Sequence, residues 1–221
     1  GVSGGAPANL PRIDERTPHF AERSWMGYVN TKALAEREVR DATLDGLWTV
    51  ILNPAGIVGP YDRTGFARLA TMLKKGELPG VGAAAPQMSS AVAIANAHVA
   101  AAKKGGVPAR NYNLCGKHVP TRDAVRACAA PLNMTAHVDQ LRTLPPPLLH
   151  ALGTAADFAS LVTRSEPPIT GVIAELMSNS GPPCTAALAV RELAFDDNED
   201  IDAVLRDSVL WLLRSAPKYF E

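Results

Sequence analysis

The stretch Leu47-Trp48-Thr49-Val50-Ile51-Leu52-Asn53-Pro54-Ala55-Gly56-Ile57-Val58-Gly59-Pro60 decides the fold of this chain. Its beginning, up to Leu52, is a short apolar and β-rich run, which predicts a strand buried on both faces, as in a parallel sheet under helices. From Pro54 onward it is a loop rich in Gly and Pro. A helix is predicted just before the stretch, from about Trp25 to Thr43, and a helix followed by a buried strand is half of a βαβ unit. The chain is therefore expected to contain a parallel α/β sheet.

The remainder of the chain is predicted to be mostly helical. Apolar spacing and stop signals indicate helices at about 65–75, 93–104, 121–130, 147–162, 169–179, 185–194 and 199–214, with a short strand at 111–114. On the first helix, Glu36 and Arg40 form an i,i+4 ion pair. The first part of the chain, up to about residue 60, therefore has an α/β pattern, and the remainder is mostly helical.

The composition bounds the class of protein. The chain has 221 residues, a formal net charge of zero, 47% apolar and 20% charged residues, which is ordinary for a soluble globular protein. A zero net charge argues against a nucleic-acid-binding protein, since such proteins carry a basic excess. No apolar run approaches the roughly 20 residues of a membrane-spanning helix, and no signal peptide opens the chain, so we expect no membrane association. Because it opens at Gly1 without Met, we expect a processed or partial chain.

No metal site is predicted. Cys115, Cys128 and Cys184 form no C-x-x-C pair and have no His at metal-ligand spacing, so they are interpreted as small apolar residues in a reducing compartment. A cytoplasmic location follows from that interpretation. The acidic run at 196–200 lacks the Gly and the distal Glu of a calcium loop and is explained as the capping region of the last helix.

Tyr28 and Lys32 are the first candidates for chemistry. On a helix, positions i and i+4 lie on one face, so the phenol and the ammonium can point into the same cleft. A nearby ammonium favours the phenolate form, which suits a tyrosine acting as a general acid and base. The spacing alone occurs by chance in about one such sequence in eight, so in isolation an exposed surface pair of little consequence is the better explanation.

The context of this pair resembles the extended short-chain dehydrogenase/reductase family. In that family a Ser or Thr, a Tyr-x-x-x-Lys helix and an Asn-Pro-x-x-hydrophobic-x-Gly-Pro loop follow one another, as Ser3, Tyr28 to Lys32 and Asn53 to Pro60 do here. The Asn-Pro form is most similar to the dihydroflavonol-reductase-like branch, near the 3β-hydroxysteroid dehydrogenases and the nucleoside-sugar epimerases. Later segments also resemble the family: Ala97-His98-Val99-Ala100-Ala101, Asn111-Tyr112-Asn113-Leu114-Cys115-Gly116 and Ala189-Val190-Arg191-Glu192-Leu193-Ala194-Phe195.

The resemblance implies a role for each of these residues. Tyr28 would be the general acid and base, Lys32 would hydrogen-bond the nicotinamide ribose of NADP or NAD, and Ser3 would orient the reacting oxygen. The implied cofactor contacts are Tyr28, Lys32, Asn53, Pro54, Ala55, Gly56 and Ile57, with the backbone N–H of Ile57 available to the carboxamide. The implied fold is the C-terminal part of a Rossmann-type, doubly wound parallel sheet with a mostly helical substrate-binding cap.

Two departures from the family pattern are visible in the sequence. The Gly-x-x-Gly-x-x-Gly turn, which places a pyrophosphate on a helix N-terminus, is not present, so we expect the chain to lack the N-terminal nucleotide-binding part. The segment Ser89-Ser90-Ala91-Val92-Ala93 also lacks the Asp residues of the family's Asp-Val-x-Asp stretch. Hydrogen bonds near the substrate cleft are therefore expected to differ.

These features give one leading hypothesis and two alternatives. Residues 1–60 would be the catalytic back half of the Rossmann domain, and 61–221 a mixed substrate-binding cap with elements that return to the sheet. The leading function is an NAD(P)-dependent oxidoreductase acting on a small-molecule carbonyl or alcohol substrate, in a family that often forms homodimers. One alternative is a sugar-nucleotide epimerase or dehydratase that uses the same Tyr and Lys. The other is a non-catalytic remnant or binding protein, because the phosphate-binding turn is absent.

Overall fold

The computed structural model describes residues 10–17, 27–63, 65–104, 110–164 and 170–220. The chain divides into two compact units, each built from three separate segments. Unit 1 comprises residues 1–57, 87–117 and 181–199, and unit 2 comprises residues 58–86, 118–180 and 200–221. The assignment of cofactor and substrate binding to particular parts of the chain stays a prediction.

Unit 1 is built around a pair of parallel strands, β1 (Val50–Pro54) and β4 (Arg110–Leu114), whose register pairs Val50 with Arg110 and Pro54 with Leu114. Its helices are α1 (Gly27–Leu44), α3 (Ala91–Lys104) and α8 (Ala187–Leu193). The short strands β2 (Gly56–Val58), β3 (Gln87–Ser90) and β5 (Lys117–His118) form a second sheet in the order β2-β3-β5. This mixture of helices and parallel strands confirms the predicted α/β class.

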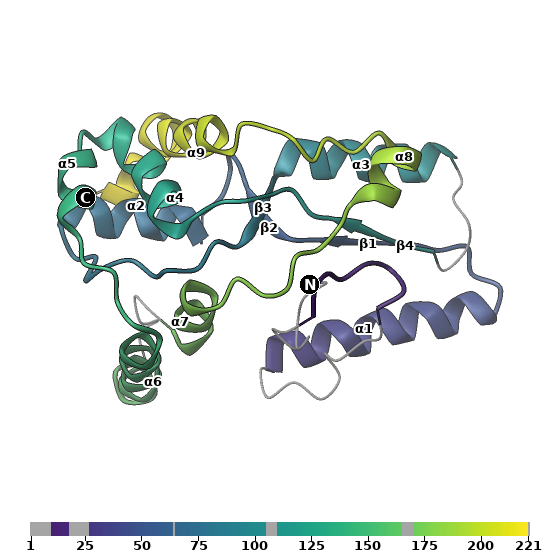
Figure 1. The fold of residues 1–221 in the computed structure, drawn as a ribbon, viewed down its shortest axis with the longest axis horizontal. Coiled ribbons are helices and arrows are strands. Elements are labelled where there is room, and N and C mark those ends of the chain that lie inside the picture. The colour runs from purple at the N-terminus through teal and green to yellow at the C-terminus, as the bar shows by residue number, and fades with distance from the viewer. Residues whose placement is uncertain (1–9, 18–26, 64, 105–109, 165–169, 221) are drawn as a thin grey trace. The chain divides into compact units, whose positions relative to one another are not determined.

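The two faces of the β1–β4 pair differ in character. On one face, Tyr112 and Leu114 of β4 join a buried apolar cluster with α3 and α8, because alternate residues of a strand point to the same side. On the other face lie Asn111 and Asn113, and Figure 1 shows α1 on this side of the strands, opposite α3 and α8. The apolar face therefore supplies the core, whereas the polar face meets α1.

The predicted strand starts three residues too early. Leu47 and Trp48 lie outside β1 and are 59% and 61% exposed. The cause is the way α1 ends: Gly46 has a left-handed φ of 97°, and Gly46 and Leu47 donate backbone hydrogen bonds to Thr43 and Ala42. Leu47 thus belongs to a Schellman cap of the helix. Within β1 only Ile51 is buried, so the expectation of a strand buried on both faces was wrong for the described part of the chain.

Unit 2 is helical. Three of its helices, α2 (Gly65–Lys75), α4 (Thr121–Ala129) and α9 (Ile201–Ser215), pack on one another around buried Leu73, Val125 and Leu205. The short helices α5 (Thr135–Gln140), η2 (Ala130–Leu132) and η3 (Pro217–Phe220) complete this group.

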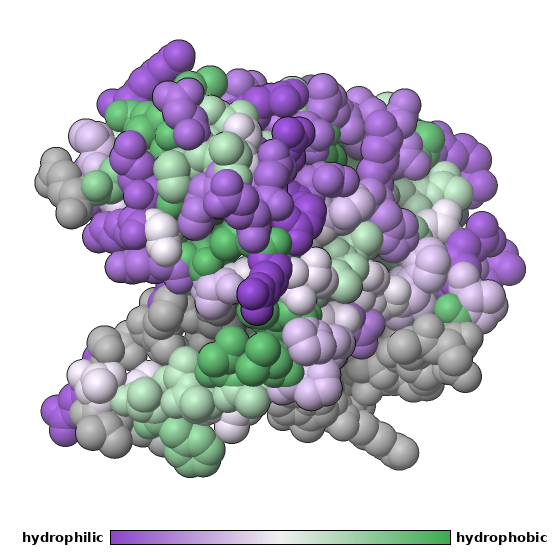
Figure 2. All heavy atoms as spheres, turned by 60° about the vertical axis from the view of Figure 1, so that its left-hand side comes forward, coloured by the Kyte–Doolittle hydropathy of each residue, from purple (hydrophilic) through white to green (hydrophobic). Residues whose placement is uncertain are grey.

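Helices α6 (Pro146–Thr163) and α7 (Gly171–Ser178) pack as a hairpin within unit 2. The close approach requires Gly153, since a Cβ there would lie 2.9 Å from the Cα of Gly171. The outer side of α6 exposes Leu148, Leu152 and Phe158, and much of the lower left of Figure 2, where this helix lies, is hydrophobic. No helix in the described ranges is both long and apolar enough to cross a bilayer.

The helix predictions are confirmed, with shifts of a few residues at the ends. The Glu36–Arg40 pair forms at 2.9 Å, and the carboxylate of Asp200 caps α9 by accepting a hydrogen bond from the backbone N–H of Ala203 (3.1 Å). The acidic run before α9 therefore serves, at Asp200, as the expected helix cap.

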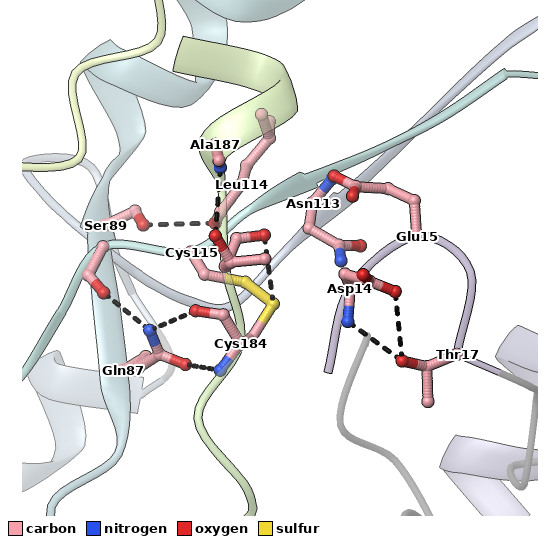
Figure 3. The surroundings of a disulfide bond; sticks show 12 residues. Asp14, Glu15, Thr17, Gln87, Ser89, Asn113, Leu114, Cys115, Cys184 and Ala187 are labelled. Atoms are coloured by element: carbon pink, nitrogen blue, oxygen red, sulfur yellow. Dashed lines mark hydrogen bonds between the residues drawn. A yellow bond between two sulfur atoms is a disulfide. The ribbon is translucent and has the colours of Figure 1, made fainter. Parts of the chain in front are cut away.

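The interpretation of the cysteines was wrong for two of the three. Cys115, which follows β4, and Cys184, which precedes α8, form a disulfide across a sequence separation of 69 residues (Figure 3). Spacing along the chain could not reveal this, because the tertiary fold brings their Cα atoms to 6.1 Å. Cys128 is the buried free cysteine that the sequence predicted. Since disulfides are rare in reducing compartments, a cytoplasmic location stays a prediction that this bond does not favour.

Candidate active site

Tyr28 and Lys32 lie side by side on the first two turns of α1. The ammonium nitrogen of Lys32 is 5.6 Å from the centroid of the Tyr28 ring, within the range of a cation–π contact. The helix buries Val29 and Ala33 and leaves Tyr28 62% exposed. The i,i+4 spacing thus places phenol and ammonium together, as the sequence predicted, and both side chains are exposed to solvent.

The expectation of a loop from Pro54 onward was wrong in part, because Pro54 is the last residue of β1 and Gly56 to Val58 form β2, so that Ala55 alone separates the two strands. Neighbouring backbone holds this connection in place. The N–H of Ala55 donates to the carbonyl of Leu114 (3.1 Å), which continues the β1–β4 pairing past Pro54. A Cβ at Gly56 would lie 3.0 Å from the carbonyl oxygen of Gln87, so this close approach to β3 favours glycine. Ile57 is 51% exposed. The connection from Pro54 to Ile57 is therefore fixed along its backbone and open to solvent at Ile57.

Asn53 makes its side-chain contact with α1. Its amide NH2 donates to the carboxylate of Glu36 (3.2 Å), and the amide NH2 of Asn111 donates to the same carboxylate (2.8 Å). The structure thus joins the Tyr28–Lys32 helix to the strand that leads into the Pro54–Ile57 connection. A direct contact between Asn53 and a cofactor stays a prediction.

Sequence reasoning did not recognise Glu36 as part of this site. It interpreted Glu36 only as the partner of Arg40 in a helix-stabilising pair. The available signal was its position four residues after Lys32, which puts it on the same side of α1.

Glu199 was missed as well. Its carboxylate accepts hydrogen bonds from the backbone N–H of Ser90 (3.2 Å) and from the Ser90 hydroxyl (2.7 Å), at the start of α3. The carboxylate of Glu199, from a distant segment, therefore contacts Ser90. Ser90 belongs to the 89–93 stretch, which lacks the Asp residues of the family pattern. Nothing in the local sequence could have signalled this contact.

Ser3 lies outside the described residues, so its place relative to Tyr28 stays a prediction. Among the described residues, no three His, Cys, Asp or Glu side chains gather as metal ligands. Burial raises the pKa of the Cys128 thiol to about 12, with smaller contributions from Asp62 and Asp202, so this cysteine stays a neutral thiol near pH 7.

Comparisons with known proteins agree with this architecture. The model of the 3-beta hydroxysteroid dehydrogenase/isomerase family matches residues 6–126, more than half of the chain. The chain belongs to this family, within the group of extended short-chain dehydrogenases/reductases that the motifs resemble. A curated relative, the decarboxylating sterol-4-alpha-carboxylate 3-dehydrogenase erg26 of Schizosaccharomyces pombe, is 37% identical over 70 residues, which are 32% of this chain and 20% of the relative.

Solved structures share the fold. A nucleoside-diphosphate-sugar epimerase from Pseudomonas aeruginosa matches with a TM-score of 0.70 at 22% identity, covering 97% of this chain and 64% of that one. A dTDP-glucose 4,6-dehydratase from Bacillus anthracis, solved in complex with NAD, matches with a TM-score of 0.68 at 16% identity, covering 99% and 60%. The chain thus spans less than two thirds of the length of these structures, and the likeness establishes a Rossmann-like fold.

Proposed function

We propose that this chain carries the catalytic helix and the Pro54–Ile57 connection of an NAD(P)-dependent oxidoreductase that interconverts a secondary alcohol and a ketone, or an alcohol and an aldehyde. The observation that carries the proposal is the exposed pair of Tyr28 and Lys32, with the ammonium 5.6 Å from the ring, in a chain that belongs to a dehydrogenase family. The curated relative is itself named a dehydrogenase, which supports oxidation and reduction over other uses of the pair.

The residues present fit a nicotinamide cofactor. Lys32 offers a positively charged donor to ribose hydroxyls. Because Gly56 has no side chain, its backbone can lie close to Gln87 of β3, which fixes the position of the Pro54–Ile57 connection. Ile57 extends from the same connection and is half exposed, as a residue that covers a flat apolar ring would be. Lys32 and the connection from Pro54 to Ile57 would hold the nicotinamide half of NADP or NAD; several solved structures of the same fold contain these cofactors.

When bound, the cofactor supplies or accepts the hydride. The hydroxyl of Tyr28 gives a proton to the substrate oxygen in reduction and takes it back in oxidation. The Lys32 ammonium stabilises the phenolate that remains after the proton has left, because opposite charges attract. Ser3 orients the substrate oxygen in this proposal, and the helix and the connection keep the reacting groups in line.

A sugar-nucleotide epimerase or dehydratase is the second candidate. Solved structures that share the fold include an epimerase and a dehydratase, and the proposed chemistry of Tyr28 and Lys32 serves both reactions. The sequence relationship to a dehydrogenase favours the first candidate. Assembly into a homodimer stays a prediction from the family resemblance.

The deciding experiment measures oxidation of NADPH or NADH by the intact, full-length protein with a panel of ketones, aldehydes and sugar nucleotides. Tyr28→Phe is expected to abolish turnover and to leave the dissociation constant of the cofactor unchanged, because it removes only the transferable proton. Lys32→Met is expected to weaken cofactor binding as well. The matched control is Tyr61→Phe, which changes another exposed tyrosine. Tyr61 lies in unit 2, whereas Tyr28 lies in unit 1, so this change is expected to leave turnover unchanged.

Retained turnover in Tyr28→Phe would contradict the proposed function. No detectable cofactor binding by a verified full-length chain would favour a non-catalytic remnant. Turnover of a sugar nucleotide without net oxidation of the cofactor would favour the second candidate.

A further inference from the structure

We propose that Glu36 is a positioning residue, which fixes the Tyr28–Lys32 helix against β1, the strand that carries Asn53 and leads into the Pro54–Ile57 connection. This inference rests on the proposed function, because it assigns the role of Glu36 through Tyr28 and Lys32. Glu36 itself touches neither the substrate nor the cofactor in this proposal.

The carboxylate of Glu36 is bound at both oxygens. Oε1 accepts hydrogen bonds from the amide of Asn111 on β4 (2.8 Å) and the guanidinium of Arg40 (2.9 Å). Oε2 accepts a hydrogen bond from the amide of Asn53 on β1 (3.2 Å). The side chain of Glu36 is only 10% exposed. One almost buried carboxylate thus joins α1 to two parallel strands.

The strand register explains how a single carboxylate reaches both strands. Ile51 of β1 pairs with Asn111 of β4, and Asn53 follows two residues further along β1. Asn53 and Asn111 are therefore diagonal neighbours on the same face of the strand pair, the face that meets α1. A shift of α1 along or around its axis would break at least one of the two contacts.

The position of Glu36 on α1 links these contacts to the reacting groups. Glu36 lies one turn beyond Lys32 and two turns beyond Tyr28, at about 6 Å and about 12 Å along the helix axis. Asn53 is followed directly by Pro54, the last residue of β1, where the connection to β2 begins. The hydrogen bond between Glu36 and Asn53 therefore sets the distance between the helix that carries the proton donor and the connection that would hold the cofactor.

If Glu36 only stabilised its own helix, it would not need hydrogen bonds to Asn53 and Asn111 on the two strands. The pair with Arg40 lies within one helix and does not fix α1 against the sheet. Glu192 offers a comparison, because its carboxylate joins α8 to β4 through Arg110 (2.7 Å) and the hydroxyl of Tyr112 (2.8 Å). Glu192 thus holds another helix of unit 1 against the same strand, and neither of these two hydrogen bonds reaches α1.

The test compares Glu36→Ala, Glu36→Gln and the matched control Glu192→Ala in the intact, full-length protein. Hydrogen exchange followed by mass spectrometry is expected to be faster in α1 for Glu36→Ala and unchanged there for Glu192→Ala. In turnover assays, Glu36→Ala is expected to lower kcat by about 10- to 100-fold with a smaller change in KM, as a misplacement of about 1 Å does. Glu36→Gln keeps one acceptor oxygen and gains an NH2 group. If the Asn111 amide turns over, that NH2 donates to the side-chain Oδ1 of Asn111, which is buried and has no hydrogen-bond partner in the described part of the chain, so Glu36→Gln is expected to recover much of the lost kcat.

Three results separate this inference from the proposed function. Unchanged exchange in α1 for Glu36→Ala would overturn the anchoring, whatever the activity. Equal losses of kcat for Glu36→Ala and Glu192→Ala would reduce Glu36 to a structural residue and overturn its positioning role. Retained turnover in Tyr28→Phe would contradict the proposed function and, with it, the role of Glu36 in the reaction, while the exchange result would still report whether Glu36 anchors α1.

Discussion

The carboxylate of Glu199 accepts two hydrogen bonds from Ser90, although 109 residues separate them in the sequence. The Ser90 hydroxyl also accepts a hydrogen bond from the backbone N–H of Ala93 (2.9 Å), so Ser90 caps α3 and Glu199 adds a negative charge at the same helix end. This contact closes the segment before α9 onto the start of α3 within unit 1.

Replacing Glu199 with Ala is expected to lower the free energy of unfolding by about 2 kcal/mol, since two hydrogen bonds to a charged group and a favourable helix-end charge are lost together. The measurement is urea unfolding followed by circular dichroism. Asp197→Ala is the matched control, because Asp197 is an exposed acid two residues away, and its loss is expected to be within about 0.5 kcal/mol. Equal effects of the two substitutions would contradict the role of Glu199.

The Cys115–Cys184 disulfide is expected to stabilise unit 1. Gln87 supports both sides of it, since its amide donates to the carbonyls of Cys184 and Gly116 (2.9 Å each) and accepts from the N–H of Cys184 (2.7 Å), as Figure 3 shows in part. Replacing both cysteines with Ser should lower the free energy of unfolding by about 4 kcal/mol, the chain-entropy value for a loop of 69 residues.

A thiol count checks the bond independently. The unfolded, unreduced chain should expose one reactive thiol, that of Cys128, and the reduced chain three. Reductant should destabilise the unsubstituted chain and leave the double Ser variant unaffected. Three thiols before reduction would show that the bond is absent.

The stability of the chain is expected to fall at alkaline pH through Cys128. Burial, with Asp62 and Asp202 nearby, raises the pKa of this thiol from 9.0 to about 12 in the folded chain. Between these values the unfolded chain binds fewer protons than the folded chain, so the free energy of unfolding decreases as pH rises. The contribution of the protonated Cys128 thiol to the free energy of unfolding is complete below about pH 9 and is lost as pH passes through about 12.

The contribution of Cys128 is measured by comparing the free energy of unfolding of the unsubstituted chain and of Cys128→Ala between pH 8 and about 11.5. All other groups that titrate are common to the two chains, so their contributions cancel. The free energy of unfolding of Cys128→Ala should decrease less with rising pH than that of the unsubstituted chain. In agreement with a neutral buried thiol, iodoacetamide should leave native Cys128 unmodified at pH 9 and modify it in urea. Parallel pH profiles for the two chains would refute the shift.

Local patterns predicted most of the secondary structure. The helices were recognisable because apolar spacing, caps and Gly stops act over a few residues, as at Asp200 before α9. The first strand was placed three residues too early, because an apolar run does not distinguish a strand from the Schellman cap formed by Gly46 and Leu47. The neighbouring Tyr28 and Lys32 were predictable for the same local reason, since i and i+4 share one side of any helix.

The sequence by itself determined the α/β class, the side-by-side placement of Tyr28 and Lys32, and the family to which the chain belongs. The tertiary structure alone decided the Glu36 contacts to Asn53 and Asn111, the hydrogen bonds of Glu199 to Ser90 and the Cys115–Cys184 bond. Periodicity and capping are properties of neighbouring residues, so they can be inferred from the sequence. A hydrogen bond or disulfide between distant segments depends on strand register and helix packing, which form only when the whole unit folds.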